Sequence, residues 1–355
     1  MTDRTRADEG VVAARPELGG GAATPSFRLP DDAPTGIPGP ARPLRIGPAT
    51  FDWGTRTFVM GILNVTPDSF SGDGLLAARG EDRGVDHGDD RGVDRREVRG
   101  DDRGADPVEA AVAIGRRMVA EGADLLDVGG QSTRPGHAVV DDAEEIARVV
   151  PVVEALRAAL PDVPLSVDTT KVAVAAAALD TGAHLVNDVW GVGEDDALLR
   201  LAADRATPIV LMHNRAEARY ANLMAEILAD LQRAIERAVR SGIAWESIIV
   251  DPGFGFGKTA AHNLVLLREL ASLRVLGRPI LLGTSRKSTL GRVLDLPPDE
   301  RVEATLATTA LGIAAGVDIV RVHDVRPNVR AARMVDAIVR DFEVPEATRG
   351  EGALP

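Results

Sequence analysis

The sequence predicts an α/β protein built as a TIM (β/α)8 barrel with a β-hairpin at its start. Eight short apolar runs recur along the chain, and stretches with helical periodicity separate them. This alternation covers roughly 295 residues, which fits eight βα units with insertions. Apolar residues make up 45% of the chain, enough for a large core. Strand order is not readable from the sequence, so a doubly wound open sheet remains the alternative.

The first elements follow an irregular leader. Residues 1–43 are rich in Pro, Gly and Asp and lack periodicity, which predicts a disordered leader. The segment "LRIGPATFDWGTRTFVMGIL", which starts at Leu44, predicts a β-hairpin that runs into a strand, with Gly54 near the bend.

The repeated units come next. The eight expected strands cover residues 58–65, 124–129, 164–169, 184–189, 208–213, 247–253, 279–284 and 318–323. The clearest helical stretches between them cover residues 109–122, 144–160 and 224–242. A single barrel domain over residues 44–340 follows from this pattern, with a flexible tail over 341–355.

One segment interrupts the pattern. Arg79–Asp106 consists almost entirely of Arg, Asp, Glu and Gly, with imperfect repeats of "DRGVD" and "DDRG". It has too few apolar residues to bury a core, so we interpret it as a disordered insertion between the first strand and the first helix. A solvated, tolerated expansion is the favoured interpretation, ahead of a dedicated binding role.

Composition narrows the functional classes. The formal net charge of −13 argues against a nucleic-acid partner, and no apolar run approaches the length needed to cross a membrane. No secretory signal is visible at the N-terminus, and the chain has no cysteine. We therefore expect a cytoplasmic protein without disulfides or cysteine-based chemistry.

Polar residues follow every apolar run. They are Asn64, Asp127, Asp168, Asn187, Asp188, His213, Asp251, Ser285, Lys287, Arg321 and His323. Each alone is explained by turn or cap formation, and His213 alone is more typical of a structural histidine than of a ligand. In a barrel, however, all strand C-termini meet on one face, where active sites lie. Together, these residues predict an active site.

The residue types indicate the chemistry. Arg321 and His323 are two apart on a strand and share a face, so with Lys287 and Arg134 they would form a positive pocket for phosphate or pyrophosphate. Asn64 offers an oxygen to Mg²⁺, which would keep waters and ligand phosphate oxygens as its other ligands.

Other side chains suit a flat heterocycle. Asp168, Asn187 and Asp251 offer acceptors and an amide to a heterocycle that carries amino and ring N–H groups. Phe254 and Phe256 could flank a flat ligand. The segment "DPGFGFGKT" is not a P-loop, because that motif needs a glycine where this chain has Pro252. No Ser-His-Asp order or carboxylate pair indicates a hydrolase.

The motifs together resemble one family. "GILNVTPDSFS", "DVGGQSTRPG", "SVDTTK", "DPGFGFGK", "GTSRKS" and "RVHDV" occur in the order found in the dihydropteroate synthase family, and the resemblance covers residues 44–340. It implies a TIM barrel, often dimeric, that joins 6-hydroxymethyl-7,8-dihydropterin pyrophosphate to 4-aminobenzoate. The products are 7,8-dihydropteroate and pyrophosphate, and the cofactor is Mg²⁺. A homodimer follows from this resemblance alone.

The resemblance also implies residue roles. The pterin would contact Asp168, Asn187, Met212, Asp251 and Lys287. The pyrophosphate would contact Asn64, Thr133, Arg134, Arg321 and His323, with Mg²⁺ at Asn64. The 4-aminobenzoate would contact Thr133, Pro135, Phe256 and Ser288, the first two from a mobile loop that also carries Arg134.

The chain departs from the family pattern in three places. Gln131 stands where many members carry Glu, and its amide keeps the hydrogen bonding, so we expect little effect. Asn214 stands where a second Met is usual, and the glycine that often follows Arg215 is missing, which leaves the fifth loop uncertain. The charged insertion lies in or just after the first catalytic loop, and we expect it to be tolerated because closure entropy grows only logarithmically with loop length.

Two alternatives remain open. A methyltransferase domain that acts on methyltetrahydrofolate would share the pterin contacts but needs no pyrophosphate site, so "SRKS" and "RVHDV" count against it. A catalytically silent paralogue would bind a pterin or a partner without turnover; the presence of Asn64, Lys287, Arg321 and His323 counts against it.

Overall fold

The computed structural model describes residues 41–65, 106–131, 140–191, 193 and 195–340. All of them belong to one compact unit, Pro34–Pro355. Several predictions fall outside the described residues. These are most of the leader, the insertion up to residue 105, the loop residues Thr133, Arg134 and Pro135, and the tail.

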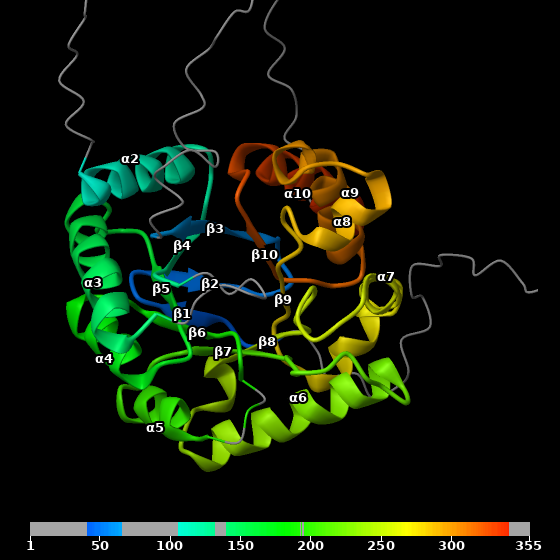
Figure 1. Cartoon of the computed structure of the whole chain (residues 1–355), viewed down its shortest axis with the longest axis horizontal. Helices are drawn as coiled ribbons and strands as arrows, with labels where there is room; N and C mark the ends of the chain where they lie inside the picture. Colours follow the sequence, from blue (N-terminus) through cyan, green and yellow to red (C-terminus); the bar gives the residue numbers. More distant parts are fainter. Residues whose placement is uncertain (1–40, 66–105, 132–139, 192, 194, 341–355) are drawn as a thin grey trace, which may run out of the picture. The chain divides into compact units, whose positions relative to one another are not determined.

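Eight parallel strands form the centre of the molecule (Figure 1). In chain order they are β3 (Phe58–Asn64), β4 (Leu125–Gly129), β5 (Leu165–Asp168), β6 (Leu185–Asp188), β7 (Ile209–Met212), β8 (Ile248–Asp251), β9 (Leu281–Leu282) and β10 (Ile319–Val322). Their order in the sheet is β8-β7-β6-β5-β4-β3-β10-β9. A parallel bridge between Val250 and Ile280 brings the two edges together. The predicted TIM barrel is confirmed, and the open-sheet alternative is wrong.

Helices surround the strands (Figure 1). They are α2 (Pro107–Ala120), α3 (Asp142–Ala159), α4 (Val172–Thr181), α5 (Ala197–Asp204), α6 (Leu223–Arg240), α7 (Ala260–Arg268), α8 (Ser288–Leu294), α9 (Val302–Ala314) and α10 (Val325–Val339). Three short 3₁₀ helices complete the described elements: η1 (Trp245–Ser247), η2 (Leu270–Leu276) and η3 (Pro298–Glu300). Asp106 caps α2, because its carboxylate accepts from the Val108 N–H at 3.0 Å.

Side chains alternate along each strand between two buried regions. One set packs between the sheet and the helices, for example Leu126 and Val128 of β4. The other set, for example Leu125, points into the barrel. Both faces of the strands are buried, which explains why they read as nearly continuous apolar runs in the sequence.

A β-hairpin packs on the interior set of side chains. Its strands are β1 (Leu44–Ile46) and β2 (Ala49–Phe51), which pair antiparallel. Phe51 stacks on Trp53 at a ring-centroid distance of 5.6 Å and lies 4.7 Å from the Phe58 ring. These rings belong to the same buried cluster as the interior side chains of the strands. The hairpin and the connection that follows it therefore add Phe51 and Trp53 to a barrel interior whose own strands contribute one ring, Phe58, among the residues of this cluster.

The hairpin was predicted, but its bend was misplaced. The bend lies at Gly47, between β1 and β2, whereas Gly54 lies in the connection from β2 to β3. Gly47 has φ +54°, and a Cβ there would lie 2.3 Å from the His184 ring. Both glycines have positive φ, so composition alone did not distinguish the two turns. Among the described residues, no helix is long and apolar enough to cross a membrane.

Candidate active site

The C-terminal halves of the strands direct polar side chains into the barrel. The register places Asp127 opposite Ser166 and Asp168 opposite Asn187. Because side chains alternate, Arg321 and His323 point the same way from β10, as the sequence predicted. The polar groups therefore form a layer above the apolar interior, at the end of the barrel where enzymes of this fold carry their sites.

Arg321 lies at the centre of this layer. Its Nε donates to Asp127 Oδ2 at 2.6 Å, and its Nη2 donates to Asp168 Oδ2 at 2.7 Å. The Asn187 amide also donates to Asp127 Oδ2, at 2.9 Å. One carboxylate oxygen of Asp127 thus links a guanidinium to an amide, which fixes the orientation of both side chains.

Burial and neighbouring charges shift the pKa values of these groups. Burial raises the pKa of Asp168 to about 7, although Arg321 opposes this change. Burial also raises the pKa of Asp251, against the effect of Lys287. Burial lowers the pKa of Lys287 to about 8, against the effect of Asp251. Burial disfavours the charge of Arg321, but Asp127 and Asp168 raise its pKa. Arg321 therefore stays charged, whereas Asp168 and Lys287 titrate near neutral pH.

Several buried oxygen atoms in this layer have no hydrogen-bond partner. Among the described residues they are Asp127 Oδ1, Ser166 Oγ and Asp168 Oδ1. A buried acceptor without a partner is costly, so such atoms are expected where a ligand supplies the donors. These oxygens are suitable acceptors for a ligand rich in N–H groups.

The loop after β8 contributes aromatic rings and a cation contact. Lys287 donates to the carbonyl oxygen of Phe254, and its Nζ lies 4.4 Å from the centroid of the Phe256 ring. Phe254 is fully buried and Phe256 is partly exposed. Of the two phenylalanines that the sequence offered for stacking, only Phe256 is accessible to a ligand.

The loops that follow β9 and β10, the seventh and eighth strands of the barrel, are linked to each other. The Nδ1 of His323 lies 2.9 Å from Ser285 Oγ, which also accepts from the His323 N–H at 3.1 Å. Arg286 has φ +57° and forms a bidentate ion pair with Asp324, at 2.6 Å and 3.0 Å. These contacts hold "SRKS" against "RVHDV" and so place Lys287 beside Arg321 in the same layer.

Of the other predicted site residues, Asn64 and Met212 lie at the ends of barrel strands, and Ser288 lies at the start of a helix. Asn64 is the last residue of β3. Its Oδ1 and the Asp168 carboxylate lie on the same side of Gly129, where each would contact a Cβ on that glycine. Met212 is buried at the end of β7, opposite Asp251 in the register. Ser288 is exposed at the start of α8.

Two strand-end residues of the sequence analysis face away from this layer. Asp188 alternates with Asn187 on β6, and its carboxylate accepts from the Trp190 N–H at 2.9 Å. His213 is fully buried between Lys258 and Asp230, which matches the structural interpretation of this histidine.

Sequence reasoning did not assign roles to Asp127 or to the ion pair between Arg286 and Asp324. Asp127 stood among the strand-end residues, but its partner Arg321 is 194 positions away in the chain. The available signal was the period of two along the strand: Asp127 lies two residues before Gly129, so the two residues share one face of the strand.

The loop departures have local explanations. Gln131 accepts a hydrogen bond from Lys171 at 2.9 Å through its amide oxygen. Asn214 is buried and donates to the Val189 carbonyl at 3.2 Å. Arg215, with no glycine after it, binds Asp230 and Glu226 of α6. Gln131, Asn214 and Arg215 therefore all make side-chain contacts among the described residues, whereas the charged insertion lies outside them.

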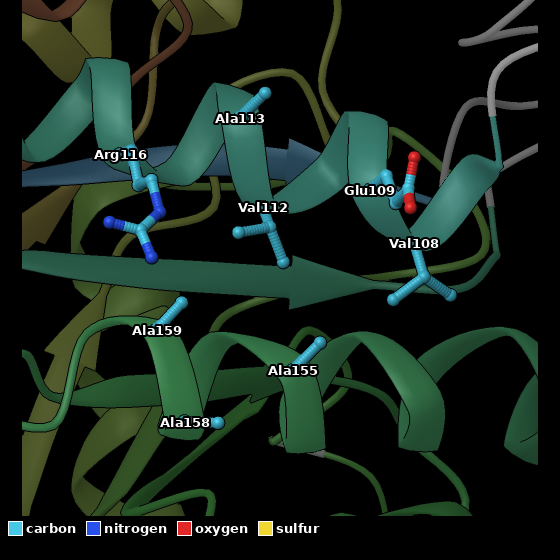
Figure 2. A pocket seen from close by; sticks show the side chains of 8 residues that line it. All are labelled: Val108, Glu109, Val112, Ala113, Arg116, Ala155, Ala158 and Ala159. Atoms are coloured by element: carbon cyan, nitrogen blue, oxygen red, sulfur yellow. The ribbon is translucent and has the colours of Figure 1, made fainter.

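A separate groove lies between α2 and α3 (Figure 2). Its lining consists of Val108, Glu109, Val112, Ala113, Arg116, Ala155, Ala158 and Ala159. Its lining is mostly Val and Ala, and it lacks the convergent polar groups of the barrel layer. We therefore place the candidate active site at the strand ends.

Comparison with known proteins identifies the family. The sequence profile of the pterin binding enzymes matches residues 101–323. The chain is 45% identical over 298 residues to the dihydropteroate synthase of Clostridium beijerinckii, and the match covers 84% of this chain and 100% of that protein. This chain belongs to the dihydropteroate synthase family. It is also 43% identical to the dihydropteroate synthase of Bacillus subtilis, over 82% of this chain and 92% of that one.

Solved structures of dihydropteroate synthases have the same fold. The Xanthomonas albilineans enzyme with 4-aminobenzoic acid has a TM-score of 0.72 at 39% identity, covering 84% of this chain and 98% of that chain. The same enzyme in complex with 7,8-dihydropteroate has a TM-score of 0.69 at 38% identity, covering 83% and 98%. Membership of the dihydropteroate synthase family favours a synthase over the methyltransferase alternative.

Proposed function

We propose that this chain joins 6-hydroxymethyl-7,8-dihydropterin pyrophosphate to 4-aminobenzoate and releases 7,8-dihydropteroate and pyrophosphate. Family membership makes it a transferase of folate biosynthesis. The observation that carries the proposal is the position of Arg321 between Asp127 and Asp168. A cation for a pyrophosphate and acceptors for a pterin thus meet in one layer.

The pterin would bind among Asp168, Asn187, Met212, Asp251 and Lys287. Unpartnered oxygens of Asp127 and Asp168 favour a ring edge that carries amino and ring N–H groups. Met212 is buried next to Asp251, so its thioether can pack on the ring face. The acceptors would therefore set the orientation of the ring, and Met212 would contribute apolar contact.

The pyrophosphate would bind to Arg321 and His323, together with Asn64, Thr133 and Arg134. A guanidinium suits phosphate oxygens because its N–H groups are planar and paired. The carboxylates of Asp127 and Asp168 both accept from Arg321, so its guanidinium is oriented before the substrate arrives. The 4-aminobenzoate would contact Phe256 and Ser288, with Thr133 and Pro135 completing its site.

Magnesium would be held mainly by the substrate. Among the residues that the structure describes, no group of three or more His, Cys, Asp or Glu side chains could hold a metal ion. Asn64 supplies one neutral oxygen at the end of β3, which fits an ion that keeps its waters and binds phosphate oxygens. When bound, Mg²⁺ would neutralise charge on the departing pyrophosphate.

The reaction needs charge stabilisation more than proton transfer. The C–O bond between the pterin methylene and the pyrophosphate breaks, and its electron pair leaves on the pyrophosphate oxygen, where Arg321 and His323 would stabilise it. The lone pair of the aromatic amine then forms the C–N bond, and the nitrogen loses a proton to a pyrophosphate oxygen or water. A neutral aromatic amine is nucleophilic, so no strong general base is required.

The proposal predicts how pyrophosphate release depends on the second substrate. Purified protein with dihydropterin pyrophosphate and Mg²⁺ should release pyrophosphate rapidly only when 4-aminobenzoate is added, and 7,8-dihydropteroate should form in equal amount. Tight pterin binding without release would instead support the catalytically silent alternative.

We also propose that the chain forms a homodimer and acts in the cytoplasm. Family resemblance motivates the dimer, and an exposed apolar face supports it. Leu311 of α9 is 44% exposed, and Met334 and Ile338 of α10 are 63% and 65% exposed. The latter two are four residues apart and share one face of α10. Large exposed apolar side chains that cluster are typical of interfaces between proteins. Cell fractionation would test the location.

A further inference from the structure

Lys258 ends the glycine-rich loop after β8. Its Nζ lies 3.0 Å from the Gly253 carbonyl oxygen, 3.0 Å from the Phe256 carbonyl oxygen and 2.9 Å from His213 Nδ1. Burial lowers the pKa of Lys258 to about 7, against the effect of Asp251, so the ammonium form predominates below that pH. This form has three N–H groups, and each of them has one acceptor. Two contacts close the loop on itself, and the third fastens it to the end of β7.

His213 is held so that it can accept this hydrogen bond. Its Nε2 lies 3.1 Å from Asp230 Oδ2 of α6. Arg215 also donates to this oxygen, from Nε at 3.0 Å and from Nη2 at 2.7 Å. A carboxylate accepts only, so the His213 proton lies on Nε2 and the lone pair on Nδ1 faces Lys258. Burial lowers the pKa of His213 to about 3, which keeps the ring neutral.

On this side the loop has one further side-chain anchor, because the Tyr220 hydroxyl donates to the Gly257 carbonyl oxygen at 2.8 Å. Gly253 has φ +68°, and a Cβ there would lie 1.8 Å from the His213 carbonyl oxygen. Gly257 has φ +55°, and a Cβ there would lie 2.4 Å from the Arg215 carbonyl oxygen. Such close approach to the β7 loop requires glycines, and glycines bring no side-chain contacts of their own. Lys258, which is partly buried, supplies the charged contacts, and Tyr220 supplies a neutral one.

The opposite side of the loop borders the candidate active site. Lys287 contacts the Phe254 carbonyl and the Phe256 ring. A Cβ on Gly255 would lie 2.9 Å from the Lys287 side chain. A shift of the loop would therefore move the Phe256 ring and the partner of Lys287 together.

We propose that Lys258 is a positioning residue that, through His213 and Asp230, fixes the loop Gly253–Lys258 and thereby places the Phe256 ring for 4-aminobenzoate. The loop contacts stand on the geometry alone, whereas the assignment of the ligand rests on the proposed function. Two of the residues assigned to the pterin, Asp168 and Asn187, lie on β5 and β6, outside this network. Two others border the loop: Asp251 accepts from the Gly253 N–H at 2.6 Å, and Lys287 contacts the Phe254 carbonyl. Because Phe256 is part of the loop itself, loss of Lys258 should raise KM for 4-aminobenzoate more than KM for dihydropterin pyrophosphate.

Kinetics of Lys258→Met test this selectivity. The variant keeps an unbranched side chain but has no N–H donors. We expect KM for 4-aminobenzoate to rise by about tenfold or more, the size of effect that follows loss of a charge-assisted hydrogen bond. KM for dihydropterin pyrophosphate should rise by a smaller factor, because only Asp251 and Lys287 of the proposed pterin contacts border the loop. Arg233→Met is the matched control, because Arg233 contacts Asp230 from a 65% exposed position and no contact joins it to the loop.

Chemical rescue distinguishes the ammonium from the shape of the side chain. The chain has no cysteine, so Lys258→Cys introduces a unique thiol. Alkylation of the unfolded variant with an aminoethyl group, followed by refolding, restores an ammonium at nearly the original length. Propylation gives the same shape without the charge. We expect KM for 4-aminobenzoate to recover in the first product and to stay high in the second.

Hydrogen exchange gives a readout that does not depend on activity. Amides of residues 253–258 should exchange faster in Lys258→Met than in the native chain or in Arg233→Met, while those of β5 and β6 should not change. Where Lys258→Met fails to fold, Lys258→Gln, which keeps two N–H donors, takes its place and should give intermediate values.

Unchanged exchange in the loop together with an unchanged KM for 4-aminobenzoate would overturn the proposal. An equal rise of both KM values would also overturn it, because the effect would then be general. If the native chain forms no dihydropteroate, the proposed function fails separately, and loop exchange still decides whether Lys258 fixes the loop.

Discussion

At the scale of single residues, the site balances three carboxylates against two cations in a buried layer. Asp127, Asp168 and Asp251 face Arg321 and Lys287. Five buried charges with an excess of one negative charge are unfavourable, and protonation of one carboxylate relieves this. The raised pKa of Asp168, about 7, is consistent with that relief.

This balance predicts a bell-shaped pH profile for kcat/KM of the pterin substrate at saturating 4-aminobenzoate. The rate should rise with pH as Asp168 ionises near 7, because an ionised carboxylate is the better acceptor for pterin N–H groups. It should fall as Lys287 loses its proton near 8. Because the two groups are coupled through their neighbours, the apparent values belong to the whole layer.

Asp168→Asn tests the assignment of the acidic limb. An amide does not titrate, so the variant should lose this limb and at least about tenfold in rate on the plateau. Steady-state kinetics across the pH range is the measurement. An acidic limb that survives in Asp168→Asn would contradict the assignment.

At the scale of elements, the period of two along each strand made the site predictable. The spacing of Arg321 and His323 placed both side chains on one face before any contact was known. The partners of these residues were not predictable, because the chain separation between Arg321 and Asp127 is 194 positions. Likewise, the helical and apolar patterns indicated all eight strands, but not which of Gly47 and Gly54 forms the hairpin bend.

The hairpin should contribute stability rather than catalysis. Phe51 is 1% exposed and packs on Trp53 and Phe58 inside the barrel. Phe51→Ala should lower the free energy of unfolding by about 3–5 kcal/mol, because it leaves a cavity. Thr50→Ala, at the exposed neighbouring position, is the control and should change it by less than about 0.5 kcal/mol.

Urea denaturation measures both hairpin variants. The folded fraction of Phe51→Ala should keep native kcat, since the hairpin packs on the apolar interior and not on the polar layer. A lower kcat at unchanged stability would show that the hairpin acts on the site instead.

At the scale of the whole molecule, the charged segment should be dispensable. We propose that residues 79–105 are a tolerated expansion, and Asp106, which follows them, is needed as the cap of α2. Deletion of 79–105 should change the free energy of unfolding by less than about 1 kcal/mol, because closure entropy depends only logarithmically on loop length. Thermal unfolding and the assay for pyrophosphate release would check this. A large loss of kcat with an unchanged melting temperature would instead assign the segment a catalytic role.

The proposed dimer predicts that charge on α10 separates the subunits. Ile338→Glu places a charge on an exposed apolar face and should give a monomer by light scattering. Val239→Glu, on a 43% exposed position of α6, is the control and should leave the mass unchanged. A monomeric native chain would contradict the proposal outright.

We propose that Arg321 joins the pterin and pyrophosphate sites, and a comparison of three proteins tests this role. Pyrophosphate release that depends on 4-aminobenzoate is measured for the native chain, for Arg321→Ala, and for Arg56→Ala as a control. Arg56 is a half-exposed residue just before β3, and it pairs with Asp124, just before β4. We predict loss of at least about a hundredfold in rate for Arg321→Ala, the size expected when a charge that stabilises a leaving group is removed, and native rates for Arg56→Ala. Native turnover in Arg321→Ala would contradict the account.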